Sequence, residues 1–202
     1  MRIDHHFTCL DALLIRARRD YAVPTWRPVP SPAPEYAREL VRSVVRGIPL
    51  GSVVLASPTT GEVHERMGPY PVVGPERIKA LVVDGAFRLF TLLGAFYEDD
   101  AGGPWPSYGY DPVADEVRAL PAPGPHLIPL REFLDTTAVQ SHEREMGRTD
   151  SAAAGIPRLW AAYDHILQCH LAVFSVRDAA KASGVALWVA PNLERTIPTP
   201  GG

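Results

Sequence analysis

The chain has 202 residues, of which 46% are hydrophobic, and a chain of this size and composition can form one domain with a full core. No stretch approaches the roughly 18 apolar residues that a membrane-spanning helix needs, and the polar residues Asp4, His5 and His6 precede any apolar run, so a secretion signal is not expected. We therefore expect a cytoplasmic protein that is not in a membrane, and the net charge of −3 argues against a large nucleic-acid-binding surface.

The first half of the chain predicts helices and strands in alternation. Thr8 and Asp11 resemble a capping box ahead of apolar residues at helical spacing, and Pro34 and Gly47 suit the beginning and end of a second helix. The expected elements are a helix ending in "RARR" (16–19), a short strand at 21–24, a proline-rich loop at 25–34, a helix from Pro34 to Gly47, and a turn followed by a valine-rich strand at 48–56.

The second half continues the alternation, with one long interruption. Residues 98–125 hold many of the Asp, Gly and Pro residues, and we expect a loop excursion there. The other expected elements are a strand at 78–83, a helix at 86–97, a short strand at 126–130, a helical turn at 131–135, helices at 139–147 and from Pro157, a strand at 171–176 and a helix at 178–189. This mixture predicts an α/β or α+β domain.

Residues 81–93 read "LVVDGAFRLFTLL", and the apolar pattern changes there from that of a strand to that of a helix. The change falls at Asp84-Gly85, and a strand-to-helix junction containing glycine offers backbone N–H groups to an anion. Arg88, about one turn into the helix, can point its guanidinium at the same place. We interpret the junction as a phosphate or carboxylate site, or as a tight turn in which Asp84 caps the helix.

Other motifs of known chemistry are absent from the sequence. It has no P-loop, no dinucleotide-binding glycine motif and no G-x-S-x-G elbow. The segment "HEREM" begins like a zinc-protease motif, but Met146 stands where the second histidine is required. Two groups have spacings that allow zinc ligation, yet no C-x-x-C pair supports it, so we interpret them as core and surface side chains and the cysteines as reduced thiols. These groups are Asp164, His165, Cys169 and His170, and His5, His6 and Cys9.

Two segments are similar, in the same order, to motifs of one bacterial family. "SVVRGIPLGSVVL" (43–55) is similar to S-[IL]-x-x-G-x-P-[IL]-G-x-[IL], and "DGAFRLFTL" (84–92) to D-G-Q-Q-R-L-T-T-L. "VPTWR" (23–27) resembles the family's P-x-[YF]-Q-R segment, and "ALWVAPNLERTIPTP" (186–200) is faintly similar to F-x-R-x-N-x-x-G-x-x-L. The chain thus resembles the N-terminal domain of GmrSD-type restriction enzymes.

The resemblance implies a single ParB/sulfiredoxin-like domain over residues 1–202, with a small mixed sheet flanked by helices. It implies binding of a nucleotide (ATP, GTP or CTP) or another phosphorylated small molecule with Mg²⁺, and hydrolysis or phosphotransfer, in bacterial defence or small-molecule biosynthesis. Asp84 and Arg88 would be catalytic, with Asp84 as Mg²⁺ ligand or base. The residues implied to bind the nucleotide or its phosphates are Gly85, Arg88, Arg27, Gly51, Ser52, Thr91 and Asn192.

The departures from the family's motifs support an alternative. Ala86 and Phe87 replace both glutamines of D-G-Q-Q-R, so two amides able to orient a water or a base are lost. The alternative is therefore a non-catalytic family member that regulates or assembles with a protein partner or a second copy. Direct DNA binding is not expected, because ParB proteins use a separate helix-turn-helix domain and none is recognisable here.

Overall fold

The computed structural model of the chain describes residues 3–24, 33–58, 66–67, 70–71, 78–97 and 105–176. Most of the expected proline-rich loop at 25–34 and the expected helix at 178–189 lie outside these residues, so both stay predictions. None of the described helices is long and apolar enough to cross a membrane.

The described helices are α1 (Leu10–Asp20), α2 (Pro34–Val45), α3 (Ala86–Tyr97), the short 3-10 helix η2 (Leu130–Leu134), α4 (Thr136–Met146), α5 (Asp150–Ala153) and α6 (Ile156–Gln168). The strands are β1 (Ile3–Cys9), β2 (Tyr21–Ala22), β3 (Ser52–Ala56), β4 (Arg66–Met67), β5 (Tyr70–Pro71), β6 (Ala80–Asp84), β7 (Tyr108–Asp111), β8 (Glu116–Ala119), β9 (Ile128–Pro129) and β10 (His170–Val176).

The main sheet has five strands in the order β1-β10-β3-β6-β2. Strands β1 and β10 are antiparallel, β10 and β3 parallel, β3 and β6 antiparallel, and β6 and β2 parallel. A three-stranded sheet, β8-β7-β9, and the small β4-β5 hairpin complete the described strands. The protein is therefore an α+β protein with a mixed sheet and flanking helices, as the sequence predicts.

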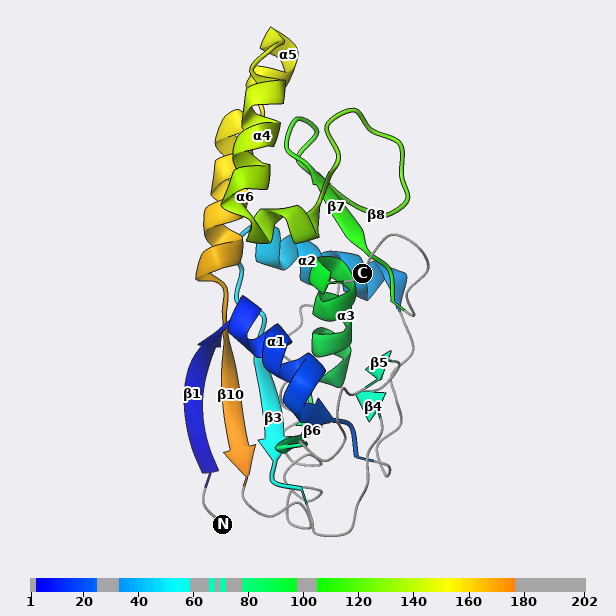
Figure 1. Cartoon of the computed structure of the whole chain (residues 1–202), viewed down its shortest axis with the longest axis vertical. Coiled ribbons are helices and arrows are strands. Elements are labelled where there is room, and N and C mark those ends of the chain that lie inside the picture. The colour runs from blue at the N-terminus through cyan, green and yellow to red at the C-terminus, as the bar shows by residue number, and fades with distance from the viewer. Residues whose placement is uncertain are drawn as a thin grey trace, which may run out of the picture.

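The elements are stacked along the long axis of the molecule (Figure 1). The main sheet lies at one end, the α4 and α6 helices with the β7-β8 hairpin lie at the other, and α1, α2 and α3 lie between them. Among the described helices α3 is the most buried, because every residue from Leu89 to Phe96 is buried. It contacts α1, α2, η2 and β7, so one core connects the two sheets.

Several expected boundaries are confirmed. Pro34 lies in the first turn of α2, and Gly47, with φ of +68°, follows its end. The helix expected at 86–97 is α3, and the strand expected at 78–83 is β6, which begins and ends later, at Ala80 and Asp84. The strand expected at 171–176 is β10, which begins one residue earlier.

The sequence did not predict β1. Its residues "IDHHFTC" lack the alternation of a half-buried strand, because β1 is at the edge of the sheet and most of its side chains are exposed or half-buried. The prediction that Thr8 caps the first helix is wrong. Thr8 is paired with Leu171 in the sheet, and Cys9 takes the N-cap position of α1 without a side-chain hydrogen bond.

The stretch expected as a loop, 98–125, contains the β7-β8 hairpin. Its aromatic residues are core residues: Trp105, Tyr108 and Tyr110 are all buried. Between the two strands, the Asp111 carboxylate accepts hydrogen bonds from the N–H groups of Val113 and Ala114. Asp111 and Pro112, two of the residues that suggested a loop, therefore mark a tight turn between strands.

Candidate functional site

Strand β6 has an extra residue just before the predicted site. Asp84 is paired with Val54 of β3, but Leu55 is paired with Val82, so Val83 is accommodated in a β-bulge. A bulge bends a strand and changes the direction of the side chains that follow it. The bulge therefore sets the direction in which β6 leaves the sheet at Asp84.

The same register places two predicted site residues on one face of the sheet. Residues paired across neighbouring strands project from the same face, and so do alternate residues of one strand. Asp84 is opposite Val54, and Ser52 lies two residues before Val54 in β3. Asp84 and Ser52 consequently share a face, at the end of β6 and the beginning of β3.

Gly85 connects β6 to α3 in a conformation that few other residues adopt. Its φ is +84°, and a Cβ atom at this position would lie 3.0 Å from the Ser52 carbonyl oxygen and 3.2 Å from Val53 Cα. The carbonyl of Gly85 accepts the hydrogen bond of Leu89 N–H at 3.0 Å, so α3 begins at once. Gly85 rather than Asp84 holds the N-cap position, and the first N–H groups of α3 point to the side where the junction lies.

Arg88 folds back over the turn that precedes β3. Its Nη1 donates a hydrogen bond to the Ser52 carbonyl oxygen at 3.1 Å. The guanidinium also lies 3.5 Å from the position of a Cβ atom on Gly51, whose φ is +81°. Arg88 thus connects α3 to the "PLGS" turn, and a guanidinium has further N–H donors besides the one that Ser52 accepts.

The Ser52 hydroxyl is buried without a hydrogen-bond partner among the described residues. The side chain belongs to a residue only 4% exposed, and its Oγ meets no donor or acceptor there. A buried polar group without a partner is costly, and such a group often marks a functional position. An oxygen atom of a ligand would satisfy the hydroxyl.

The remaining predicted site residues are placed differently. Thr91 lies in the second turn of α3, past Arg88, where it is fully buried and its hydroxyl, like that of Ser52, lacks a partner among the described residues. Arg27 and Asn192 lie outside the described residues. The structure therefore brings together Gly51, Ser52, Asp84, Gly85 and Arg88.

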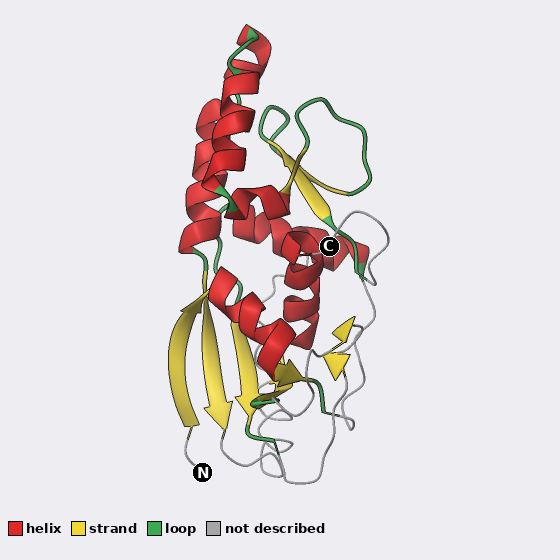
Figure 2. Cartoon of the chain, viewed as in Figure 1, coloured by secondary structure: helices red, strands yellow, loops and turns green. Residues whose placement is uncertain are grey.

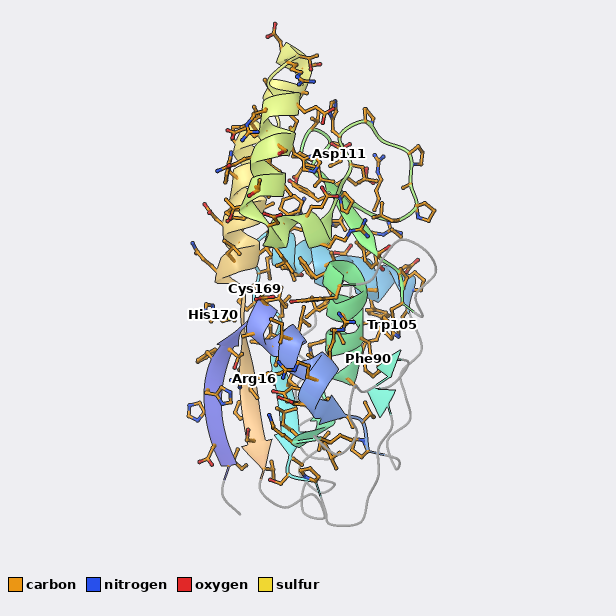
Figure 3. All side chains as sticks on the ribbon, viewed as in Figure 1. Arg16, Phe90, Trp105, Asp111, Cys169 and His170 are labelled. Atoms are coloured by element: carbon orange, nitrogen blue, oxygen red, sulfur yellow. The ribbon has the colours of Figure 1, made fainter. Side chains whose placement is uncertain are left out.

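Phe87, which stands where the D-G-Q-Q-R motif has its second glutamine, is part of an aromatic cluster. Phe87 packs edge-on against Trp105, with ring centroids 5.2 Å apart, and Phe90 packs against the same indole at 5.7 Å. Figure 3 labels Phe90 and Trp105, which lie together beside α3. Phe87 therefore contributes to packing, and its position offers no polar group to a ligand.

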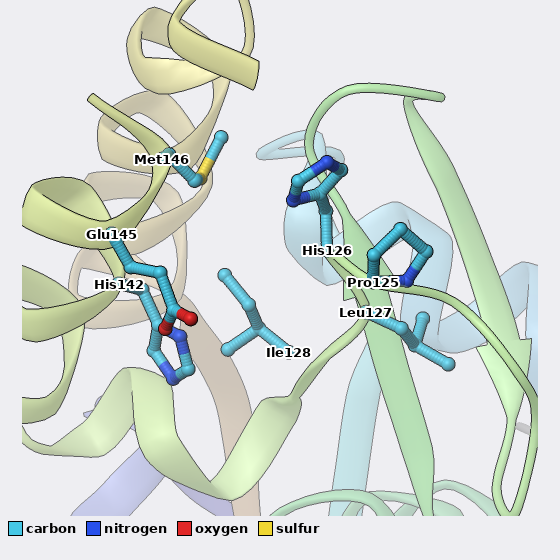
Figure 4. A pocket seen from close by; sticks show the side chains of 7 residues that line it. All are labelled: Pro125, His126, Leu127, Ile128, His142, Glu145 and Met146. Carbon is cyan, nitrogen blue, oxygen red and sulfur yellow. The ribbon is translucent and has the colours of Figure 1, made fainter. Parts of the chain in front are cut away.

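A small pocket lies elsewhere, between α4 and the segment before β9 (Figure 4). Its volume is about 90 Å³, which is room for a few water molecules and not for a nucleotide. His142, Glu145 and Met146 line the α4 side, and His126 lies across from them. The sequence pointed to His142 only through an incomplete motif. Its Nε2 lies 2.5 Å from a Glu132 carboxylate oxygen, a contact that residue spacing did not indicate.

Some of the histidines that could ligate zinc by spacing have other contacts. Within the described ranges, no three His, Cys, Asp or Glu side chains lie close enough to hold a metal ion. The His165 Nδ1 lies 2.9 Å from the Val45 carbonyl oxygen, and His5 stacks on Phe174. Burial raises the pKa of the Cys169 thiol to about 11, so this cysteine stays protonated at neutral pH.

The protein thus has a mixed α+β fold in which Gly85 joins the bulged strand β6 to the buried helix α3. Arg88 of that helix contacts the turn before β3. No model of a known family matches the chain, and no curated protein matches it significantly. The resemblance to the GmrSD N-terminal domain therefore rests on the two sequence motifs, and it stays a prediction.

Proposed function

We propose that the junction of β6 and α3 binds the phosphate groups of a nucleotide. The observation that carries the proposal is the convergence of Arg88, the buried Ser52 hydroxyl and the N-terminus of α3 at the Gly51-Ser52 turn. Each of these groups donates hydrogen bonds to oxygen, and a helix N-terminus together with a guanidinium favours a negative charge.

The glycines at the junction support the same conclusion. Gly51 and Gly85 both have positive φ, and a side chain at either would point at the groups described above. Their absence of side chains keeps the backbone N–H groups accessible at close range, as anion-binding turns require. The Phe-Trp packing next to them fixes where α3 begins.

One carboxylate, that of Asp84, is placed to hold Mg²⁺ at this site. Asp84 is the carboxylate on the same sheet face as Ser52, and Mg²⁺ is commonly bound by one or two carboxylates with the remaining ligands from phosphate and water. Asp84 would then hold the ion beside the phosphates, and the ion would neutralise charge that develops on them. With the ion there, hydrolysis or phosphotransfer is the reaction class that we propose.

A second function is favoured by Phe87. Because this residue packs on Trp105 and Ala86 has no polar atom, the loop supplies no amide to orient an attacking water. A nucleotide bound here without turnover would make the protein a regulatory or partner-binding module.

Titration calorimetry with ATP, GTP, CTP and ADP, with and without Mg²⁺, tests binding, and phosphate release measured in parallel tests turnover. We expect at least one nucleotide to bind, and Arg88→Lys to weaken binding about tenfold or more, because lysine lacks the guanidinium's fork of donors. Phosphate release that depends on Asp84 supports the hydrolase or phosphotransferase, and binding without release supports the regulatory module.

The matched control is Arg42→Lys, because Arg42 is a half-exposed residue of α2 whose side chain makes an ion pair with the exposed Glu39. This variant should bind nucleotide like the unmodified protein. If no nucleotide binds, or if both variants lose affinity equally, the proposal is wrong.

A further inference from the structure

Strand β1 is the outer strand of the main sheet, with β10 on one side and no described strand on the other (Figure 2). Proteins usually protect an edge strand by making it short or by placing charged residues, above all lysine, a proline or a bulge in it. The seven residues of β1 contain neither lysine nor proline, their one acidic residue is Asp4, and they pair with β10 without a break in register. The edge is therefore suited to pairing with another strand.

The register shows which backbone groups face outward. Leu10 N–H donates to the Cys169 carbonyl at 2.8 Å, which continues the β1–β10 ladder by one residue. In an antiparallel ladder the backbone groups of successive residues point to opposite sides. Because Leu10 points toward β10, the N–H and C=O groups of Ile3, His5 and Phe7 point away from β10.

The side chains of the same three residues lie in a row on one face of the strand, which we call the β1 edge (Ile3, His5 and Phe7). Phe7 is 72% exposed and Ile3 is 44% exposed. His5 stacks on Phe174 of β10, with ring centroids 6.2 Å apart, so the row continues onto the neighbouring strand. Outward backbone groups and exposed apolar side chains therefore occur together at the β1 edge.

We propose that β1 pairs antiparallel with β1 of a second copy of the chain, about a two-fold axis at His5. In this register Ile3 is opposite Phe7 of the partner, and the two His5 residues are opposite each other. In these pairs the outward N–H and C=O groups of one copy can form hydrogen bonds with those of the other. Asp4 is opposite His6 in a pair without backbone hydrogen bonds, where side chains lie closer together.

Complementarity within β1 selects a second copy as the occupant. In this pairing Ile3 is opposite Phe7, an apolar pair, and Asp4 is opposite His6, a carboxylate–imidazole pair. Each pair occurs twice, because the two-fold axis of an isologous interface repeats every contact. The next symmetric register, about His6, would set His6 against His6 and Asp4 against Thr8, so the carboxylate–imidazole pair would be lost. The proposal is independent of the phosphate site, which lies on β3 and α3.

Sedimentation velocity over a range of protein concentrations tests the interface. We expect a dimer, and we expect Phe7→Lys to raise its dissociation constant at least about tenfold, because two buried aromatic contacts are replaced by charges. The control is Tyr36→Lys on α2, whose side chain is 62% exposed and remote from β1, and it should leave the dimer unchanged. A monomer at every concentration, or equal effects of the two variants, overturns the proposal.

Cross-linking tests the register. In a background with Cys9→Ser and Cys169→Ser, His5→Cys should form a disulfide-linked dimer on oxidation, since the Cα atoms of such a pair lie about 5.5 Å apart. His6→Cys in the same background should not. Cross-linking through His6→Cys but not His5→Cys would overturn the two-fold axis at His5.

Discussion

Gly85 is the most constrained residue of the candidate site. Its positive φ and the 3.0 Å approach to the Ser52 carbonyl exclude a side chain for two independent reasons. Arg88 depends on this approach, because its hydrogen bond to the same carbonyl needs α3 to begin against β3. One glycine therefore determines both the direction of the helix and the place of the guanidinium.

Gly85→Ala should lower the free energy of unfolding by about 2–4 kcal/mol, because the methyl group adds backbone strain and a clash with β3. Urea denaturation followed by circular dichroism measures the change. The control is Gly147→Ala: Gly147 follows α4 with φ of −65°, and a Cβ atom there would lie 3.4 Å from the Glu143 carbonyl oxygen, an ordinary contact distance. Equal effects of the two substitutions would contradict this account of the junction.

At the scale of elements, the helices begin in different ways. Asp135 caps α4 through its carboxylate, which accepts a hydrogen bond from Thr137 N–H at 2.8 Å. Thr149 holds the corresponding position before α5 without such a bond, and Cys9 does the same before α1. Helix α1 is instead held by packing, since Leu10, Leu13 and Leu14 are all buried.

Asp135→Ala should therefore lower the unfolding free energy by about 1 kcal/mol, the usual cost of losing an N-cap side chain. Thr149→Ala is the comparison, and it should change stability little because its hydroxyl makes no capping bond. Thermal and urea unfolding of both variants measure the difference. A loss as large for Thr149→Ala as for Asp135→Ala would show that capping is not the cause.

At the scale of the whole molecule, tyrosines in the core that joins the two sheets, or packed against it, keep their phenol groups protonated at neutral pH. Tyr97 is hydrogen-bonded to Asp11, and Tyr110 donates to the Asp115 carboxylate at 2.9 Å. Burial, more than these carboxylates, raises both pKa values above the ordinary value of 10.0. Burial also raises the pKa of Tyr21 and Tyr108.

The sign of the resulting pH dependence follows from linkage. A raised pKa means that the folded protein holds the proton more tightly than the unfolded chain, so the stability is present below pH 10 and is lost as pH rises above it. We expect the free energy of unfolding to fall above pH 10. The double variant Tyr97→Phe/Tyr110→Phe should show a shallower fall, as measured by urea titration on both sides of pH 10.

The exposed Tyr36 supplies the control for this experiment. Because its side chain is 62% exposed, Tyr36→Phe should leave the alkaline loss of stability as it is in the unmodified protein. An equally steep loss in the double variant would mean that groups other than Tyr97 and Tyr110 cause it.

The sequence alone determined the elements with strong local signals. Pro34 and Gly47 bound a helix because each residue restricts or permits backbone angles regardless of its surroundings. The spacing of apolar residues changes from that of a strand to that of a helix at Asp84-Gly85, and this local change predicted the strand-to-helix junction. The α+β class followed because the chain contains segments with both kinds of spacing.

Only the tertiary structure decided what depends on distant partners. β1 is a strand because β10, more than 160 residues away in the register Ile3 to Val176, supplies its hydrogen bonds, and no local pattern contains that information. The β7-β8 hairpin is part of the core because Trp105, just before β7, packs against Phe87 and Phe90 of α3. Arg88 lies on the Gly51-Ser52 turn because the bulged pairing of β3 with β6 carries that turn to α3. These contacts depend on long-range pairing and packing, which residue spacing along the chain does not specify.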